Sequence, residues 1–266
     1  NIRKEEPFNA VKTWIEYINR VLGVLTGLFI MGTAALSLAF WNHDRTISYV
    51  GLGGLVLVIF QGWIGSIVVS TNLLPWMISV HTLLALGLVA LLIYGIARAH
   101  RDRFATLSLD NLGKLNRLIV AGIVLFLVQI VLGTQVREEV DVVAAAFEYM
   151  NRSAWIEELG ASFYVHRTYS LVLFALHAYF WYELRKQSQV QAAVKPWANF
   201  MLGGIALEIL TGAMMAYFAI PKFLQPIHLL LATGIFGLQV WIYLRLNARR
   251  FFPSLKSSER SSSRPS

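Results

Sequence analysis

The chain has 266 residues, of which 56% are hydrophobic and only 14% are charged, and its formal net charge is +8. This composition excludes an ordinary soluble domain, because the surface of such a domain is covered by many more charged residues. The absence of cysteine excludes disulfides, cysteine-ligated zinc and thiolate nucleophiles within these residues. No nucleic-acid-binding motif accompanies the basic excess, which therefore indicates membrane topology and attraction to anionic lipid.

Seven stretches are long and apolar enough to cross a bilayer, since a spanning helix needs about 20 mostly apolar residues. In chain order they are Val21–Phe40, Ile47–Val69, Trp76–Ala97, Leu118–Val136, Tyr164–Tyr182, Trp197–Ala219 and Ile227–Leu244. The alternation of polar and apolar residues that is typical of a barrel does not occur in them. The sequence therefore predicts an all-α polytopic membrane protein, because helices satisfy their own backbone groups in lipid.

Lysine and arginine residues concentrate on one side of these predicted helices. They lie in the loops that follow Ala97 and Tyr182 and in the tail that follows Leu244. The opposite side carries the long loop Arg137–Phe163, which contains six acidic residues: Glu138, Glu139, Asp141, Glu148, Glu157 and Glu158. By the positive-inside rule the basic side is cytoplasmic, and we expect a multi-pass protein of the cell inner (cytoplasmic) membrane.

An internal repeat relates the two halves of the chain. An offset of 147 residues aligns Asn19-Arg20 with His166-Arg167, Gly65 with Gly212, and His81 with His228. The predicted helix Leu118–Val136 has no partner, because its copy would fall before Asn1. We therefore expect eight helices in the intact chain, as tandem duplicated four-helix bundles, of which the first helix is missing from an N-terminally truncated sequence.

The predicted domains follow from this repeat. Residues 1–104 form the N-terminal bundle, residues 105–116 a cytoplasmic linker and residues 117–250 the C-terminal bundle. The Ser-rich remainder, residues 251–266, is expected to be a disordered cytoplasmic tail.

Four repeated polar residues are expected at a similar depth, toward the non-cytoplasmic side: Asn19, His81, His166 and His228. Imidazoles from two facing helices are a usual way for a membrane bundle to hold haem iron at both axial positions. A single membrane histidine is more often an interhelical hydrogen-bond donor than an iron ligand. A pair at one depth, repeated by duplication, favours two haem sites, His166 with His228 and His81 with Asn19.

Charged residues flank these positions. Arg20 and Arg167 directly follow the ligand positions, and either clamp haem propionates or anchor the helices at lipid headgroups. Glu16 lies one turn before Asn19, where the second copy has Phe163. A carboxylate in only one half suggests that the halves differ in role, although a solvated residue at the membrane edge is the alternative.

Two further polar residues are expected inside the second half. His177 lies three turns beyond His166, about 16 Å deeper on nearly the same face. It either bonds a neighbouring helix or lines a path for protons or electrons, and the first is the more usual role. Glu208 either bonds a neighbouring helix or carries protons, and its counterpart in the first half is Gln61. Gly212 permits close helix contact or close approach to a macrocycle.

Five segments in this order resemble the haem A synthase family, which makes haem A for cytochrome oxidases. They are Trp14–Arg20, Gln61–Thr71 followed by Pro75 and His81, Leu132–Glu138, Val165–Arg167 and Pro226–His228. The resemblance implies a duplicated eight-helix enzyme that oxidises a methyl group of haem O to formyl by successive hydroxylations. It also implies a haem b cofactor at His166 and His228 in the C-terminal half.

For the N-terminal half the resemblance implies that haem O binds as substrate at His81 and that Glu16 is catalytic. The family usually has histidine where this chain has Asn19. Haem O would then be five-coordinate through His81, Asn19 would hold a water, or the activity has been lost or changed. The family's cysteine pair would lie before Asn1.

The implied partners are haem O synthase (protohaem farnesyltransferase) and cytochrome oxidase assembly factors. A homo-oligomer is a further partner that the sequence allows but does not determine. A di-haem b electron-transfer protein and a non-catalytic haem carrier remain alternatives. Both would use the same histidines, but electron transfer has no need of Glu16 in one half alone.

Overall fold

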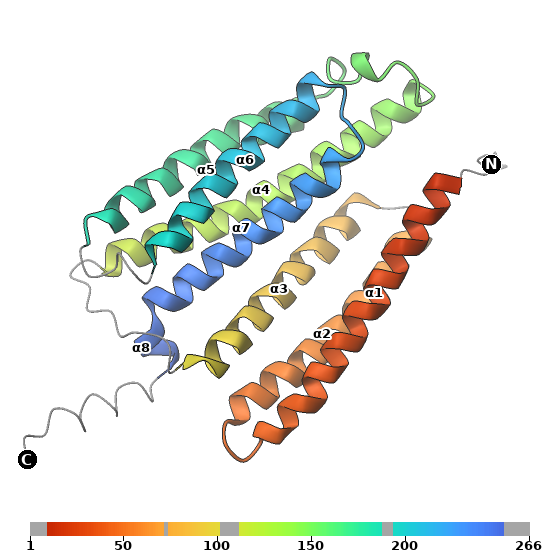
Figure 1. Ribbon diagram of the computed structural model, residues 1–266. Coiled ribbons are helices and arrows are strands. Elements are labelled where there is room, and N and C mark those ends of the chain that lie inside the picture. Colours follow the sequence, from red (N-terminus) through yellow and green to blue (C-terminus); the bar gives the residue numbers. More distant parts are fainter. Residues whose placement is uncertain (1–9, 72–73, 102–111, 188–193, 253–266) are drawn as a thin grey trace, which may run out of the picture. The chain divides into compact units, whose positions relative to one another are not determined.

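The structure is a computed structural model that describes residues 10–71, 74–101, 112–187 and 194–252 (Figure 1). The described residues form α-helices, joined by turns that include short 3-10 segments, and contain no strand. The helices are α1 Ala10–Ser37, α2 Arg45–Ser70, α3 Pro75–Ala99, α4 Leu112–Ala146, α5 Ala161–Arg185, α6 Lys195–Tyr217, α7 Leu224–Leu246 and α8 Ala248–Phe251.

Six helices in the described part of the chain are long and apolar enough to cross a membrane: α1, α2, α3, α4, α6 and α7. The remaining predicted span lies in α5, a helix of 25 residues. His166, Arg167 and His177 make α5 more polar than its neighbours. The prediction of an all-α, multi-pass membrane protein is confirmed.

Two helices extend well beyond the apolar stretches that predicted them. α1 begins at Ala10 rather than Val21, so Glu16 and Asn19 lie inside the helix. α4 runs from Leu112 to Ala146 and takes in the end of the predicted linker and the start of the predicted outer loop. Apolarity alone misses these turns, because α4 continues as a partly polar helix with an Arg137–Asp141 ion pair at 3.8 Å.

The C-terminal boundary also differs from the prediction. The predicted disordered tail begins at residue 251, but Phe251 ends α8 and Phe252 is fully buried. Phe252 packs with Ala97, Leu244 and Ala248, so the apolar contacts continue past the last span. The rest of the predicted tail lies outside the described residues.

Contacts divide the chain into two compact units, residues 1–67 and 68–266, and each is described by itself. In the first unit α1 and α2 meet near their connecting turn, where the Ser48 hydroxyl donates to the Ser37 carbonyl at 2.7 Å. The Asp44 carboxylate accepts from the Thr46 amide at 3.2 Å and caps the start of α2.

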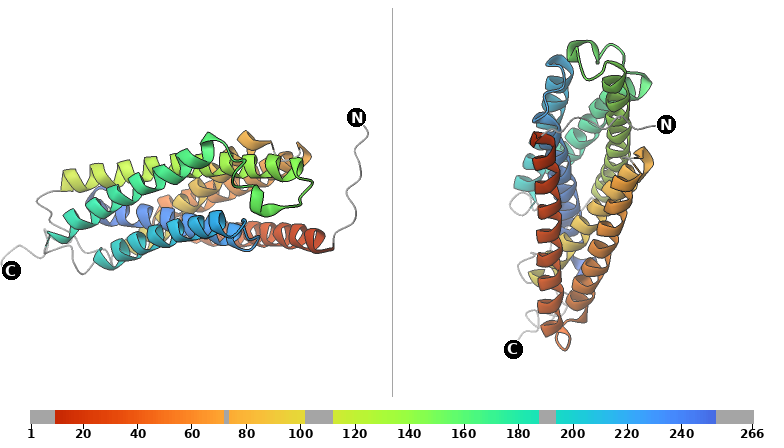
Figure 2. Two further views of the ribbon diagram at one scale, coloured as in Figure 1. Left: turned by 90° about the horizontal axis from the view of Figure 1, so that it is seen from above. Right: turned by 90° about the vertical axis from the view of Figure 1, so that its right-hand side faces the viewer.

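In the second unit α4 and α6 each pack against both α5 and α7. The four helices therefore form a closed bundle with α5 and α7 at diagonal corners, and they run side by side in both views of Figure 2. α3 packs outside this bundle, against α4 and α7. The predicted boundary instead groups α3 with α1 and α2, and that division stays a prediction.

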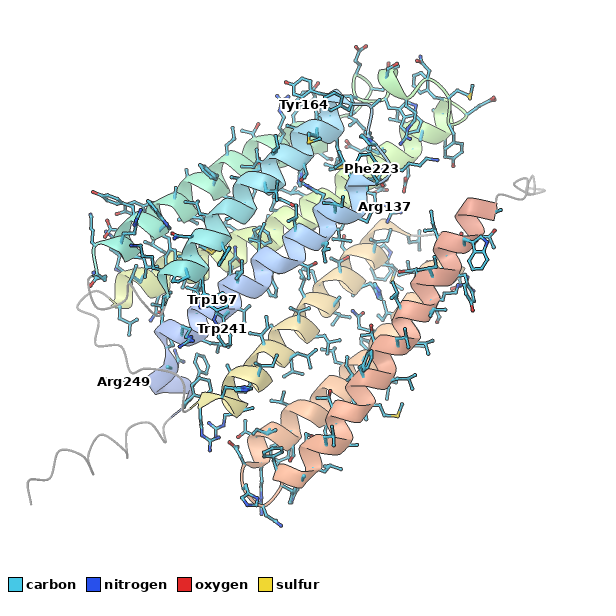
Figure 3. The ribbon with its side chains drawn as sticks, in the orientation of Figure 1. Arg137, Tyr164, Trp197, Phe223, Trp241 and Arg249 are labelled. Carbon is cyan, nitrogen blue, oxygen red and sulfur yellow. The ribbon has the colours of Figure 1, made fainter. Side chains whose placement is uncertain are left out.

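Aromatic and basic side chains mark the two ends of this bundle (Figure 3). Tyr164 and Phe223 lie at one end, and Trp197, Trp241 and Arg249 lie at the other. Amphipathic aromatic rings favour the two membrane–water interfaces, and arginine favours the cytoplasmic one. The first is called the Tyr164 end below, and the second the α8 end.

Candidate functional site

His166 and His228 lie in the second turn of α5 and α7, the two diagonal helices of the bundle. Both helices start at the Tyr164 end and run toward the α8 end (Figure 1). The two imidazoles therefore lie at similar depth, on helices that face one another across the bundle.

Each of these imidazoles packs against a glycine of an adjacent helix. A Cβ atom added at Gly133 of α4 would lie 3.2 Å from Cε1 of His166. A Cβ atom added at Gly212 of α6 would lie 3.4 Å from Cε1 of His228. The helices between the histidines thus present bare backbone beside both rings, where a larger side chain would push the ring away.

Two side chains of α6 hold the Nδ1 atom of His228. It lies 2.9 Å from Oγ1 of Thr211 and 3.2 Å from Oε1 of Glu208. The Thr211 hydroxyl donates its proton to the Glu208 carbonyl at 2.9 Å, so toward His228 it accepts. Nδ1 therefore carries the proton and Nε2 keeps its lone pair, as an iron ligand requires.

His166 is held differently. Its backbone carbonyl accepts a hydrogen bond from Nε2 of Gln129 at 3.0 Å. Its ring atom Nδ1 is buried and has no hydrogen-bond partner among the described residues, and the same holds for the hydroxyl of Tyr169 one turn later. Buried polar atoms nearly always have a partner, so these two indicate a ligand site.

These features fit a haem held by two imidazoles. Neutral His228 offers Nε2, Gly133 and Gly212 leave space beside the rings, and α5 has unsatisfied polar atoms at this level. The described residues contain no cluster of three or more His, Cys, Asp or Glu side chains that would suit a different metal site.

Arg167 is exposed, and its guanidinium lies over the rings of Phe163 at 5.8 Å and Tyr164 at 5.3 Å. Stacking of this kind suits an interfacial anchor, and it leaves the donors at the edge of the guanidinium plane available to a carboxylate. The propionate role of Arg167 stays a prediction.

In the other half, Glu16, Asn19 and Arg20 are exposed on one face of α1. His81 is half-buried on α3. Two residues before it, the hydroxyls of Ser79 and Thr134 share a hydrogen bond that joins α3 to α4. Asn19 and His81 belong to different units of the chain, so their pairing stays a prediction.

Two residues of the site escaped the sequence analysis. Gly133 lies inside the segment Leu132–Glu138, which the family resemblance singled out without giving it a role. Thr211 precedes Gly212, but a threonine in an apolar helix carries no signal of its own. His177 bonds a neighbouring helix through Gln239, which confirms the more usual of its two expected roles.

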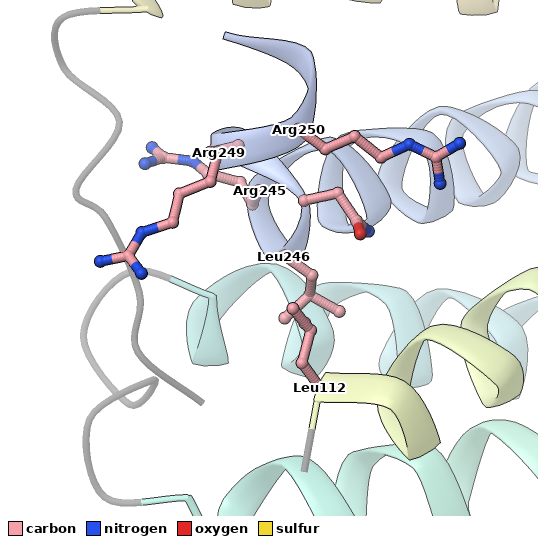
Figure 4. Close-up of a pocket in the computed structure, with 7 residues that line it drawn as sticks. Leu112, Arg245, Leu246, Arg249 and Arg250 are labelled. Atoms are coloured by element: carbon pink, nitrogen blue, oxygen red, sulfur yellow. The ribbon is translucent and has the colours of Figure 1, made fainter. Parts of the chain in front are cut away.

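A small pocket lies far from these histidines, where α7 passes into α8 (Figure 4). Leu112 of α4 closes one side, and Arg245, Arg249 and Arg250 are among the residues that line it. None of the predicted site residues lines this pocket.

The family model described as cytochrome oxidase assembly protein, COX15-CtaA, matches residues 4–240. Neither a curated protein nor a solved structure matches the chain. The family match covers most of the chain, including both halves of the repeat and every predicted site residue. The chain therefore belongs to the COX15-CtaA family of cytochrome oxidase assembly proteins.

Proposed function

We propose that this protein is a haem A synthase, which oxidises a methyl group of haem O to a formyl group. Each of two successive hydroxylations removes two electrons from the methyl carbon and adds one oxygen atom. The oxidant is external to this chain, either molecular oxygen, which also supplies the oxygen atom, or an electron acceptor, with water as the source of the oxygen atom. The resulting geminal diol loses water to leave the formyl group. Membership of the assembly family supports a role in supplying the oxidase. The observation that carries the haem chemistry is the pair His166 and His228, each beside a glycine.

His166 and His228 would hold a resident haem b, and the haem would supply a one-electron redox centre when bound. Thr211 and Glu208 orient the imidazole of His228 through Nδ1, and as acceptors of the Nδ1 proton they make that imidazole a stronger donor. Arg167 is the proposed partner of a propionate in this half.

His81 is the proposed ligand of the substrate haem O, with Arg20 as the propionate partner. Asn19 is a poor iron ligand, so the opposite iron face stays open or receives a water held by the amide. Glu16 is the proposed catalytic carboxylate, which orients water or moves protons near the reacting methyl group. The isoprenoid tail of haem O suits lateral entry from the bilayer.

The proposed setting is the cell inner membrane, with the histidines toward the outer side. Haem O synthase is the proposed source of substrate, cytochrome oxidase assembly factors are the proposed recipients, and the protein is proposed to form homo-oligomers.

The test is to express the chain in a host that accumulates haem O, extract the haems and identify them by reverse-phase chromatography and mass. We expect haem A or its hydroxymethyl intermediate, and their loss in Glu16→Gln. Glu158→Gln is the matched control, since Glu158 is also an exposed carboxylate but lies in a loop.

Haem b bound to the protein without conversion of haem O would contradict the synthase and favour an electron-transfer protein. Haem O bound and released unchanged would favour a carrier. His166→Ala and His228→Ala should each abolish haem b retention, whereas removal of the exposed imidazoles of His43 and His100 should leave it unchanged.

A further inference from the structure

A second polar layer lies below the histidine pair, and it repeats the spacing of that pair. His177 follows His166 by eleven residues on α5, and Gln239 follows His228 by eleven on α7. Gly122 precedes Gly133 by eleven on α4, which runs in the opposite direction. Eleven residues are close to three helical turns, so all three positions move about 16 Å toward the α8 end.

The residues of this layer close on one another. Nε2 of Gln239 lies 2.9 Å from Nε2 of His177, and Nδ1 of His177 lies 2.7 Å from the Leu173 carbonyl. The carbonyl can only accept, so Nδ1 donates to it and Nε2 accepts from the amide of Gln239. Both ring nitrogens are thus engaged, and His177 and Gln239 are 1% and 0% exposed.

The ring of His177 also packs against a glycine of α4. A Cβ atom added at Gly122 would lie only 2.8 Å from Nε2 of His177, so the imidazole lies against the bare backbone of α4. A rotation of α5 or α7 would separate His177 from Gln239 and leave two polar groups unpaired inside the bundle. That loss is costly where no water replaces the bond.

The eleven-residue spacing links this layer to the one above. Eleven residues turn an α-helix by about 20° more than three full turns, so His177 and His166 lie on nearly the same face of α5. The same holds for Gln239 and His228 on α7. A contact that fixes the rotation of α5 and α7 about their axes at His177 and Gln239 therefore also fixes it at His166 and His228.

The apolar counterparts in the first half support a role tied to the second half. The 147-residue offset places Ile30 opposite His177 and Leu92 opposite Gln239 in the repeat. Two apolar residues therefore occupy these positions in the half that lacks a histidine pair.

We propose that His177 and Gln239, seated on Gly122, form a positioning lock that turns α5 and α7 so that His166 and His228 face one another. The proposal rests on the proposed haem site, but the facing of the two helices does not depend on haem and is measured without it. His177 and Gln239 act through His166 and His228 and touch no ligand themselves.

The first measurement uses the whole chain without haem. The sequence contains no cysteine, so His166→Cys with His228→Cys introduces a single thiol pair. Cross-linking by a short reagent that is thiol-reactive at both ends, such as a bis-methanethiosulfonate, should fall several-fold when Gln239→Leu is added. It should recover in the exchange His177→Gln with Gln239→His, which restores the bond with its ends reversed.

The matched control is a second interhelical polar pair. Asn116 of α4 and Asn247 exchange hydrogen bonds of 2.9 and 2.7 Å at the α8 end. Asn116→Leu should lower the unfolding temperature in detergent but leave cross-linking unchanged. Equal cross-linking with and without Gln239→Leu would overturn the lock and leave the pair a packing contact.

The second measurement uses the chain with both histidines, loaded with haem b. The electron paramagnetic resonance spectrum of the ferric haem depends on the mutual angle of the two imidazoles. We expect a shifted or heterogeneous spectrum in Gln239→Leu, restoration in the exchange variant and no change in Asn116→Leu. An unchanged spectrum in Gln239→Leu would contradict the lock, whereas failure of the unaltered chain to bind haem b would contradict the proposed function alone.

Discussion

Nδ1 of His228 lies 3.2 Å from Oε1 of Glu208, so a carboxyl group contacts the ring nitrogen that is not the proposed iron-binding atom. Both residues belong to the closed four-helix bundle, His228 on α7 and Glu208 on α6. A hydrogen-bond acceptor at Nδ1 fixes the tautomer of the imidazole and makes it a stronger donor through Nε2. The first half has Gln61 at the position of Glu208, so the two halves differ in this electrostatic feature.

Glu208→Leu should raise the reduction potential of bound haem b, because it removes an acceptor of the Nδ1 proton of His228 and so makes the imidazole a weaker donor. Thr211→Val removes the second partner of Nδ1 and should lower haem affinity about 10–100-fold, as loss of such partners usually does. A redox titration and a haem-retention assay measure the two effects. Glu157→Gln, in an exposed loop, is the control, and an equal shift there would refute the assignment.

Gly133→Leu should abolish haem b retention, because the new side chain would occupy the space beside His166, where even a Cβ atom lies at 3.2 Å. Gly203→Leu is matched, since a Cβ atom there meets nothing within 4 Å. It should keep haem and gain roughly 0.5–1 kcal/mol of helix stability. Pyridine haemochrome spectra give the haem content, and equal loss in both variants would point to a general packing defect.

Asn19→His should increase the retention of haem O, because a second imidazole would compete for the open iron face. Formation of haem A should fall if the open face or a water held by Asn19 is needed for turnover. Extracted haems measure both quantities in one experiment. Asn19→Ala distinguishes a need for an open iron face from a need for a water held by Asn19, since alanine leaves the iron face open but cannot bind the water.

Glu183→Gln should lower the unfolding temperature only slightly, because both cationic partners are partly exposed to solvent and their charges are screened. Glu183 accepts from Lys114 at 3.0 Å and from Lys186 at 2.9 Å, which joins α4 to the end of α5. Thermal unfolding in detergent at low and high salt measures the difference. An equal difference at both salt concentrations would contradict an electrostatic origin.

The same ion pairs give a pH dependence. The hydrogen bond with Glu183 raises the pKa of Lys186 above its ordinary value. A raised pKa means that this stabilisation is fully present below the ordinary lysine pKa and disappears as the pH rises through the folded-state value. Lys186→Met should therefore lower the unfolding temperature at neutral pH and make little difference at strongly alkaline pH.

Apolar length and charge asymmetry were sufficient to predict the class of this protein from its sequence. A helix in lipid satisfies its own backbone, so the spanning stretches could be recognised one at a time. The repeat likewise related His166 to Asn19 and His228 to His81, because a constant offset along the sequence can be found without knowing the three-dimensional structure. These signals are local or periodic, and they led to the correct fold class and family.

The tertiary structure alone decided what surrounds each histidine. The contacts of His228 with Thr211 and Glu208, and of His166 with Gly133, join helices that are distant in sequence and carry no shared pattern. The ends of α1 and α4 were missed because they depend on polar and tertiary contacts rather than on apolarity. The His177–Gln239 bond belongs to the same class, since it exists only once packing has set the rotation of α5 against α7.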